Sequence, residues 1–304
     1  MEYRRLGSLS VSLVGIGCNN FGWRTDAAGT RAVVDAALES GMNFFDTADC
    51  YGAGDSEKFL GAALKGRRDK AIIATKFGIK MGEGKEGADP RYVREALDAS
   101  LQRLQTDTID LYQIHTPDPN TPIADTLEAL NDAVKAGKVR EIGCSNFSAE
   151  QLRDARATPG PHYFASVQNE YSLLKREPEE DVLPECARTG VTFLPYFPLA
   201  NGLLTGKYRN DSPFPESSRG KDAFGPKIFT PENLGFAEAL ASFAQSRNRS
   251  LLELAFSWLA ARPQVCSIIA GAKTAEQVRA NSSAAAWKLT AADFVELEGI
   301  LRPD

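Results

Sequence analysis

Eight short apolar segments recur along the chain at similar intervals, with amphipathic stretches between them. The segments are rich in β-branched and aromatic residues and span residues 13–16, 43–45, 71–75, 109–114, 139–143, 165–168, 192–195 and 267–269. Six of the seven intervals between their starts measure 26 to 38 residues, which suits one strand, one helix and two loops. Eight such units predict an α/β fold, a (β/α)8 or TIM barrel.

Helix signals occupy the spaces between these segments. Amphipathic periodicity, caps and stop residues predict helices at 31–39, 90–104, 125–136, 149–157, 234–245, 251–260 and 291–301. Residues 3–6 and 9–11, separated by Gly7-Ser8, predict a β-hairpin able to close one end of the barrel. The last interval spans 75 residues and holds a loop rich in Gly, Pro and Ser, which predicts a functional segment. No linker divides the chain, so we expect one domain over 1–304.

A doubly wound dinucleotide-binding sheet is the alternative α/β fold. Its fingerprint is a GxGxxG loop after the first strand, followed by an acidic residue at the second strand. Here Gly15 and Gly17 are followed by a displaced glycine at Gly22, and no acidic residue stands in the required context. The barrel is therefore the preferred fold.

Composition limits the partners. The net charge is −5, and the 35 basic and 40 acidic residues are well mixed, which disfavours nucleic acid and anionic membranes as partners. Residues 1–6 lack the apolar core of a signal peptide, and no apolar run approaches the ~20 residues of a membrane helix. Five cysteines without a CxxC pair predict a reducing, cytoplasmic setting, and two histidines make a metal site unexpected.

Four ionisable residues follow three successive predicted strands, where a barrel carries its chemistry. Asp46 follows the second strand, Tyr51 lies five residues later, Lys76 ends the third strand and His115 ends the fourth. Carbonyl reduction needs a hydride donor and a proton for the developing alkoxide. A tyrosine can give that proton, a nearby ammonium lowers its pKa, and a carboxylate holds the ammonium.

The same residues also have ordinary structural interpretations. A strand-end tyrosine often packs, an aspartate caps a helix, a lysine is solvated and a single histidine is structural. Their joint occurrence favours the chemical interpretation, in which Tyr51 donates the proton and His115 hydrogen bonds the carbonyl oxygen.

The chain resembles the aldo-keto reductase superfamily over essentially its whole length. The segments NFFDTADCYG at 43–52, ATKFG at 74–78, IHTPD at 114–118 and GCSNF at 143–147 match the family's signatures. The resemblance implies NAD(P)H-dependent reduction of aldehydes or ketones by the tetrad Asp46, Tyr51, Lys76 and His115. It also implies small carbonyl substrates, and we expect a monomer or weak oligomer.

The family binds a nicotinamide dinucleotide across the barrel mouth. By resemblance, Ser145, Asn146 and Gln168 hold the carboxamide and Tyr196 stacks on the nicotinamide, although the first two could simply cap a helix. The segment 199–207 resembles the pyrophosphate loop, where Lys207 could pair with phosphate. The implied cofactor contacts are Asp46, Ser145, Asn146, Gln168, Tyr196, Phe197, Pro198, Leu199, Gly202, Leu203, Lys207, Gly271, Ala272, Lys273, Gln277 and Asn281.

The adenosine end decides between the two nicotinamide cofactors. Lys273 is the candidate for a 2′-phosphate, which favours NADPH, with a solvated loop lysine as the alternative. Many family members carry Glu where this chain has Ala280 and Arg where it has Gln277. Both differences remove adenosine contacts, so NADH remains open.

The substrate pocket has few sequence signals. Trp23, Phe77 and Phe147 stand on loops beside the tetrad and are candidates for lining it, or for ordinary packing. The chain ends soon after its last predicted helix, so we expect an open site without a long C-terminal loop. Cys50 adjoins Tyr51 and is expected to be buried and inert, with an oxidation-sensitive thiol as the alternative.

Two other functions use the same residues. Lys76 could form a Schiff base in a lyase or aldolase, although a carboxylate partner would keep it protonated and poorly nucleophilic. The chain could also be a non-catalytic NADP(H)-binding regulatory subunit, although no partner-binding extension is apparent.

Overall fold

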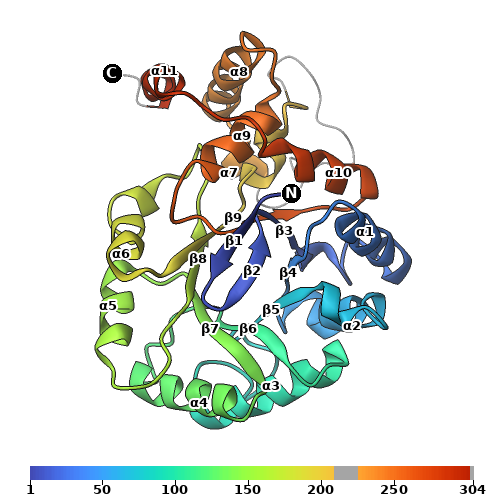
Figure 1. Ribbon diagram of the computed structural model, residues 1–304, viewed down its shortest axis with the longest axis vertical. Coiled ribbons are helices and arrows are strands. Elements are labelled where there is room, and N and C mark those ends of the chain that lie inside the picture. Colours follow the sequence, from blue (N-terminus) through green and yellow to red (C-terminus); the bar gives the residue numbers. More distant parts are fainter. Residues whose placement is uncertain (209–224, 302–304) are drawn as a thin grey trace.

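The computed structural model describes residues 1–208 and 225–301, and within them eight parallel strands close a barrel (Figure 1). The order around the ring follows the chain, and the last strand closes it against the first, with Ile268 opposite Val14. The barrel strands are β3 (Val14–Gly17), β4 (Phe44–Asp46), β5 (Ile72–Phe77), β6 (Ile109–Ile114), β7 (Val139–Ser145), β8 (Ser166–Glu170), β9 (Thr192–Tyr196) and β10 (Ile268–Gly271). The predicted barrel is confirmed, and the doubly wound sheet is wrong.

Helices surround the barrel on its outside, as Figure 1 shows. The α-helices are α1 (Ala27–Glu39), α2 (Asp55–Ala63), α3 (Pro90–Leu104), α4 (Ile123–Lys135), α5 (Ala149–Ala157), α6 (Val182–Thr189), α7 (Gly225–Ile228), α8 (Pro231–Gln245), α9 (Leu251–Ala260), α10 (Ala275–Ala284) and α11 (Ala291–Leu301). Short 3-10 turns are η1 (Cys18–Asn20), η2 (Tyr51–Gly54), η3 (Arg68–Lys70), η4 (Glu177–Glu179) and η5 (Ala200–Thr205). The extra helices predicted after β9 and near the C-terminus are present, whereas residues 209–224 of that interval lie outside the described residues.

Local sequence signals explain where several helices begin. The Ser148 side chain accepts from the Gln151 backbone while the Gln151 side chain accepts from the Ser148 backbone, which is the predicted capping box of α5. Helix α1 begins at Ala27, before the predicted start, because Asp26 caps it by accepting from Gly29 N. The apolar periodicity begins only after that first turn, so it missed the true start.

The N-terminal hairpin closes the amino-terminal end of the barrel. Strands β1 (Tyr3–Leu6) and β2 (Leu9–Ser12) pair antiparallel and lie across the barrel's centre in Figure 1. Its buried leucines and valine form one cluster with inward-facing strand residues: Leu6, Leu9, Val11, Phe44, Ala74, Leu111, Leu194, Cys266 and Ile269. Arg4 fastens it by donating to the carbonyl oxygens of Val265 and Ala260, both at 2.7 Å. The opposite, carboxyl end is left for chemistry.

Several strands run one or two residues beyond their predicted ends. The apolar pattern stops at 45, 75 and 143, but the ladders continue to Asp46, Phe77 and Ser145. Backbone pairing does not depend on side-chain polarity, so strands persist where the inward side chains become polar. Asp46, Lys76 and Ser145 are nearly or fully buried on these extensions.

Two further observations concern the predicted setting of the protein. All five cysteines lie in the described part of the chain and none forms a disulfide. Over residues 1–208 and 225–301, no helix combines the length and apolar character needed to span a bilayer.

Candidate active site

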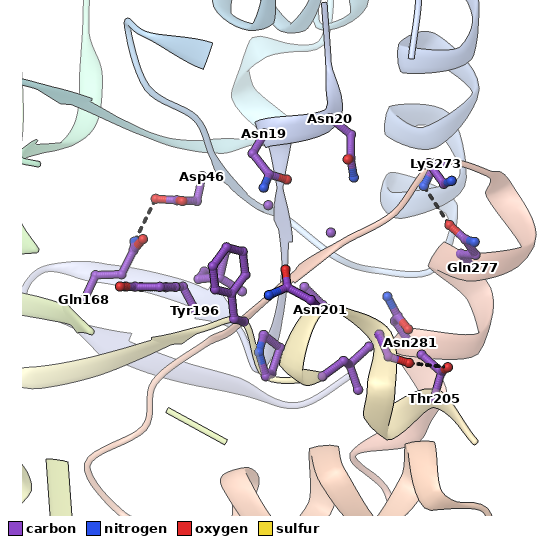
Figure 2. Close-up of a pocket in the computed structure, with 18 of the residues that line it drawn as sticks. Asn19, Asn20, Asp46, Gln168, Tyr196, Asn201, Thr205, Lys273, Gln277 and Asn281 are labelled. Carbon is purple, nitrogen blue, oxygen red and sulfur yellow. Dashed lines mark hydrogen bonds between the residues drawn. The ribbon is translucent and has the colours of Figure 1, made fainter. Parts of the chain in front are cut away.

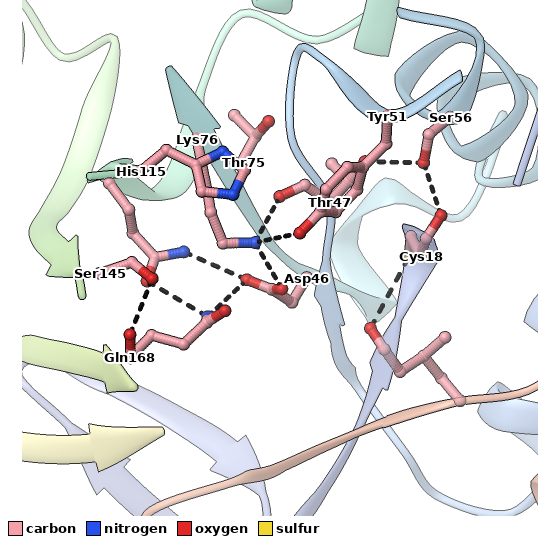
Figure 3. Close-up of polar contacts among 12 residues, drawn as sticks. Cys18, Asp46, Thr47, Tyr51, Ser56, Thr75, Lys76, His115, Ser145 and Gln168 are labelled. Atoms are coloured by element: carbon pink, nitrogen blue, oxygen red, sulfur yellow. Dashed lines mark hydrogen bonds and ion pairs between the residues drawn. The ribbon is translucent and has the colours of Figure 1, made fainter. Parts of the chain in front are cut away.

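The four residues of the predicted tetrad meet at the carboxyl end of β4, β5 and β6 (Figure 3). The Lys76 ammonium donates to Asp46 Oδ2 at 2.6 Å, to the Thr47 carbonyl at 3.0 Å and to the Tyr51 hydroxyl at 3.4 Å. The rings of Tyr51 and His115 meet edge to face with centroids 5.8 Å apart. One lysine therefore connects the carboxylate to the phenol, as the sequence predicted.

The Lys76–Asp46 pair is almost completely buried, with side-chain exposures of 1% and 3%. Burial disfavours the ammonium, but the Asp46 charge and the Tyr51 contact outweigh it and hold the pKa of Lys76 above its usual value. The lysine is therefore charged at neutral pH, and a protonated amine is a poor Schiff-base nucleophile.

The electrostatics of Tyr51 differ from the sequence expectation. Burial raises the pKa of Tyr51 to about 12, while the Lys76 ammonium lowers it and offsets only part of that increase. The predicted net lowering is wrong, because desolvation outweighs the charge of Lys76. The phenol is neutral at physiological pH and can act as a proton donor, with Lys76 positioned to stabilise the phenolate that remains.

His115 is held neutral. Burial first and the Lys76 charge second lower the pKa of His115 to about 3. A neutral imidazole donates from one ring nitrogen only, so it can give a carbonyl oxygen a hydrogen bond but no net positive charge. Its Nδ1 lies 3.8 Å from the Cys50 sulfur.

A glutamine that sequence reasoning missed completes the support of Asp46. Gln113 Nε2 and Gln168 Nε2 donate to Asp46 Oδ1 at 3.1 and 2.9 Å, while Oδ2 receives Lys76. Gln113 points inward from β6 and is fully buried. An inward glutamine inside an apolar strand was the available signal, because a buried amide needs a partner.

A cavity of about 520 Å³ extends from the tetrad across the barrel mouth. Figure 2 shows its polar residues spread from Asp46 and Gln168 at one end to Lys273 and Asn281 at the other. Of the predicted residues it is lined by Asp46, Tyr51, His115, Ser145, Asn146, Gln168, Tyr196, Phe197, Pro198, Leu199, Gly202, Lys207, Gly271, Lys273, Gln277 and Asn281. The structure thus brings most of the predicted site into one connected space.

At the tetrad end, hydrogen bonds fix the residues expected to face a flat ring. Asn146 Nδ2 donates to the His115 carbonyl at 2.9 Å, and the Tyr196 hydroxyl donates to Asn146 Oδ1 at 2.8 Å. Ser145 Oγ donates to the Gln168 carbonyl at 2.7 Å. Asn146 has a positive φ of 63°, a conformation that asparagine tolerates better than most residues. The Tyr196 ring therefore has a fixed place beside the Asp46 cluster.

The loop after β9 follows an unusual backbone path. Phe197, Ala200 and Asn201 have φ values of 51°, 44° and 55°, and Gly202 has 99°. Consecutive residues in this sparsely populated region concentrate where a structure holds a ligand. This segment borders the middle of the cavity.

The far end of the cavity carries the basic and amide groups. Lys273 lies at this end, where Gln277 Oε1 accepts from its backbone N–H at 2.7 Å, and Lys207 is the other lysine that lines the cavity. Asn281 is only 5% exposed and lines the same end of the cavity (Figure 2). A buried amide facing a cavity is a ready contact for a polar ligand.

These residues fit a nicotinamide dinucleotide. A fixed aromatic ring and buried amides lie near the tetrad, and Lys273 and the Asn281 amide lie at the other end of the cavity, which Lys207 also lines. These groups suit the aromatic ring, the charged phosphates and the nucleoside of one extended molecule. Gln168, Lys207, Lys273 and Asn281 are the residues that would hold it.

Some predicted residues lie elsewhere. Lys76 is buried beneath the cavity, while Leu203 and Ala272 are in the apolar core. Phe77 is fully buried and stacks on Tyr112, with centroids 4.8 Å apart. Phe147 packs against Phe164. Neither phenylalanine lines the cavity that holds Tyr51.

Trp23 is also separate from that cavity. It is 66% exposed, stacks beneath Arg24, and borders a neighbouring open hollow that shares only Lys273 with the cavity. None of the three predicted aromatic residues therefore lines the cavity beside the tetrad.

Several lining residues were absent from the prediction: Gly17, Asn19, Asn20, Asn201, Thr205, Leu252, Ile269 and Ala270. Asn19 and Asn20 lie in η1, the turn that follows β3, so a search of the loops at strand ends would have found them. Leu252 comes from α9 and carries no sequence signal.

The chain matches known proteins over nearly its whole length. A family model described as the aldo/keto reductase family matches residues 13–302. The aldo-keto reductase YhdN of Bacillus subtilis is 36% identical over 313 residues, covering 99% of this chain and 94% of that protein. The aldo-keto reductase yakc [NADP(+)] of Schizosaccharomyces pombe is 34% identical over 308 residues, covering 97% and 89%.

Solved structures agree. A glycerol dehydrogenase of Gluconobacter oxydans superposes with a TM-score of 0.86 at 31% identity, covering 98% of this chain and 94% of that one. An aldo-keto reductase of Bacillus halodurans, in its holo form, gives a TM-score of 0.82 at 35% identity, covering 100% and 97%.

Proposed function

This chain belongs to the aldo-keto reductase family, and from that premise we propose that it reduces aldehydes or ketones to alcohols with NADPH, using Tyr51 as the proton donor. Family membership makes it an oxidoreductase of small carbonyl compounds. We propose, beyond family membership, that Tyr51 is the proton donor and that NADPH is the cofactor.

The observation that carries the proposal is the single lysine that contacts both Tyr51 and Asp46, with the Lys76 and Asp46 side chains almost completely buried. A bound nicotinamide cofactor supplies the hydride. As negative charge develops on the carbonyl oxygen, the Tyr51 hydroxyl gives its proton, and the Lys76 ammonium stabilises the phenolate. Asp46 keeps Lys76 charged and in place, and His115 donates a hydrogen bond to the same oxygen.

NADPH is proposed over NADH because of Lys273. It lines the cavity at the end away from the tetrad, and the loop that carries it is held by the Gln277 side chain. An ammonium there favours a 2′-phosphate over a 2′-hydroxyl. The name of one relative, yakc [NADP(+)], is consistent with this choice. The cytoplasmic location, the single domain and the oligomeric state stay predictions.

Replacing Tyr51 by Phe tests the proton donor. Tyr51→Phe keeps the ring beside His115 and removes the hydroxyl, so carbonyl reduction should fall by about 10²–10⁴-fold. NADPH binding, followed by fluorescence titration, should be nearly unchanged. Reduction of an aldehyde and ketone panel at near wild-type rates would assign the proton to another group.

A further inference from the structure

The Cys50 thiol lies beside the imidazole of His115, the residue proposed to hydrogen bond the carbonyl oxygen. Cys50 lies just before Tyr51, and its Sγ is 3.8 Å from His115 Nδ1, at the long end of a sulfur hydrogen bond. The contact bears on the hydrogen-bonding role proposed for His115, because that role depends on which ring nitrogen carries the proton.

Of the two possible donors in this contact, the thiol is the better one. Burial raises the pKa of Cys50 to about 11, so the sulfur keeps its proton at neutral pH. The pKa of His115, lowered to about 3, leaves the imidazole neutral with one nitrogen that must accept. An imidazole nitrogen accepts well and a thiol sulfur poorly, so S–H donating to Nδ1 is the better pairing.

We infer that Cys50 is a positioning residue that fixes the tautomer of His115. With Nδ1 accepting from the thiol, the ring proton resides on Nε2, the nitrogen left for the cavity that His115 lines. The imidazole is then prepared to donate to a carbonyl oxygen. This inference rests on the proposed function for its purpose, although the tautomer itself can be measured without turnover.

The neighbouring contacts leave this task to Cys50. The Asn146 amide donates to the backbone carbonyl of His115, and the Tyr51 ring meets the imidazole edge to face. Among the described residues, the contact with Cys50 is the side-chain hydrogen bond found at a His115 ring nitrogen. The thiol is thus the contact that distinguishes the two nitrogens.

Nitrogen-15 NMR of the full-length protein tests the inference directly. The chain has only two histidines, and His162 is exposed on a surface loop, so His162→Gln leaves one imidazole signal. Long-range proton–nitrogen correlations separate the two tautomers. We expect the Nε2–H form in the parent, and a shift of the tautomer ratio toward Nδ1–H by about three- to tenfold in Cys50→Ala. Cys50→Ser, which keeps a donor, should restore part of the ratio.

Kinetics supply the second readout. In Cys50→Ala, kcat for a carbonyl substrate should fall in proportion to the Nε2–H fraction, with the dissociation constant for NADPH unchanged. A parent protein in the Nδ1–H form, or a Cys50→Ala protein with an unaltered tautomer ratio, overturns the inference. Failure of the proposed function can be told apart from failure of this inference. If the wild type reduced no carbonyl substrate, the proposed function would be wrong, whereas the tautomer of His115 would still be given by the NMR measurement.

Discussion

The Lys76 ammonium lies 2.6 Å from the Asp46 carboxylate, and the two side chains are 1% and 3% exposed. Breaking a buried pair leaves one uncompensated charge, which is more costly than removing both. Lys76→Met should therefore lower the free energy of unfolding by about 3–5 kcal/mol, measured by urea denaturation. The double variant Asp46→Asn/Lys76→Met should recover most of that stability.

Activity should not recover with stability. Both variants lack the ammonium beside Tyr51, so each should lose carbonyl reduction by about 100-fold or more. A double variant that regained turnover together with stability would mean that the pair is only structural.

The two lysines that line the cavity, Lys207 and Lys273, should behave differently. Lys273→Met should weaken NADPH binding by about tenfold and leave NADH binding nearly unchanged, because the 2′-phosphate distinguishes the two cofactors. Lys207→Met is the matched control, since a pyrophosphate contact is shared and both affinities should fall together. Fluorescence titration of both nucleotides measures this, and equal losses in Lys273→Met contradict its assigned contact.

Asp49 makes stability depend on pH. Burial, with the Glu57 charge second, raises the pKa of Asp49 to about 7, while Arg103 and Lys76 offset part of the increase. The folded state therefore keeps a proton on Asp49 that the unfolded state releases near pH 4. The stability that Asp49 contributes is fully present below pH 4 and is lost as the pH rises through 7. The Asp49 carboxylate also interacts electrostatically with three other titratable groups: Cys50, Tyr92 and Tyr112.

Asp49→Asn should remove this dependence. Near pH 4 the free energy of unfolding of Asp49→Asn should exceed that of the wild type by nothing, and above pH 7 the excess should reach at most about 4 kcal/mol. Urea denaturation across that range measures it. A gain that is the same at every pH would contradict the raised pKa.

The hairpin end of the barrel should matter for stability and not for catalysis. Leu9 is 1% exposed and packs with Phe44 and Leu111 at the end opposite the tetrad. Leu9→Ala should cost about 2–5 kcal/mol of unfolding free energy, with kcat and NADPH affinity unchanged at temperatures where the variant is folded. A selective loss of NADPH affinity in the folded variant would show coupling between the two ends.

Strand ends show what apolar periodicity can and cannot predict. The pattern located all eight barrel strands because a strand covered on both faces must be apolar. It ended several of them too early, so that the predicted ranges left out the strand residues Asp46, Lys76 and Ser145, which belong to the candidate site. The apolar pattern ends at the first polar residue, but the backbone hydrogen bonds between the strands continue past it.

The candidate site divides in the same way. The tetrad was predictable because strand-end position and residue chemistry are both written in the sequence. Gln113 did carry a signal, a glutamine inside an apolar strand, which sequence reasoning missed. The orientations of Phe77 and Phe147 were not predictable, since which way a side chain points depends on strand register and on neighbouring helices. Phe77 turned away to stack on Tyr112, whereas Gln113 turned in to meet Asp46.

By itself, the sequence determined the barrel, its hairpin and the four residues at the strand ends, because periodicity and residue type encode them locally. Only the tertiary structure decided the ionisation of the site. Burial outweighed the Lys76 charge at Tyr51, held His115 neutral and brought the Cys50 thiol to one of its nitrogens. Desolvation depends on every atom packed around a group, so no short segment of sequence carries it.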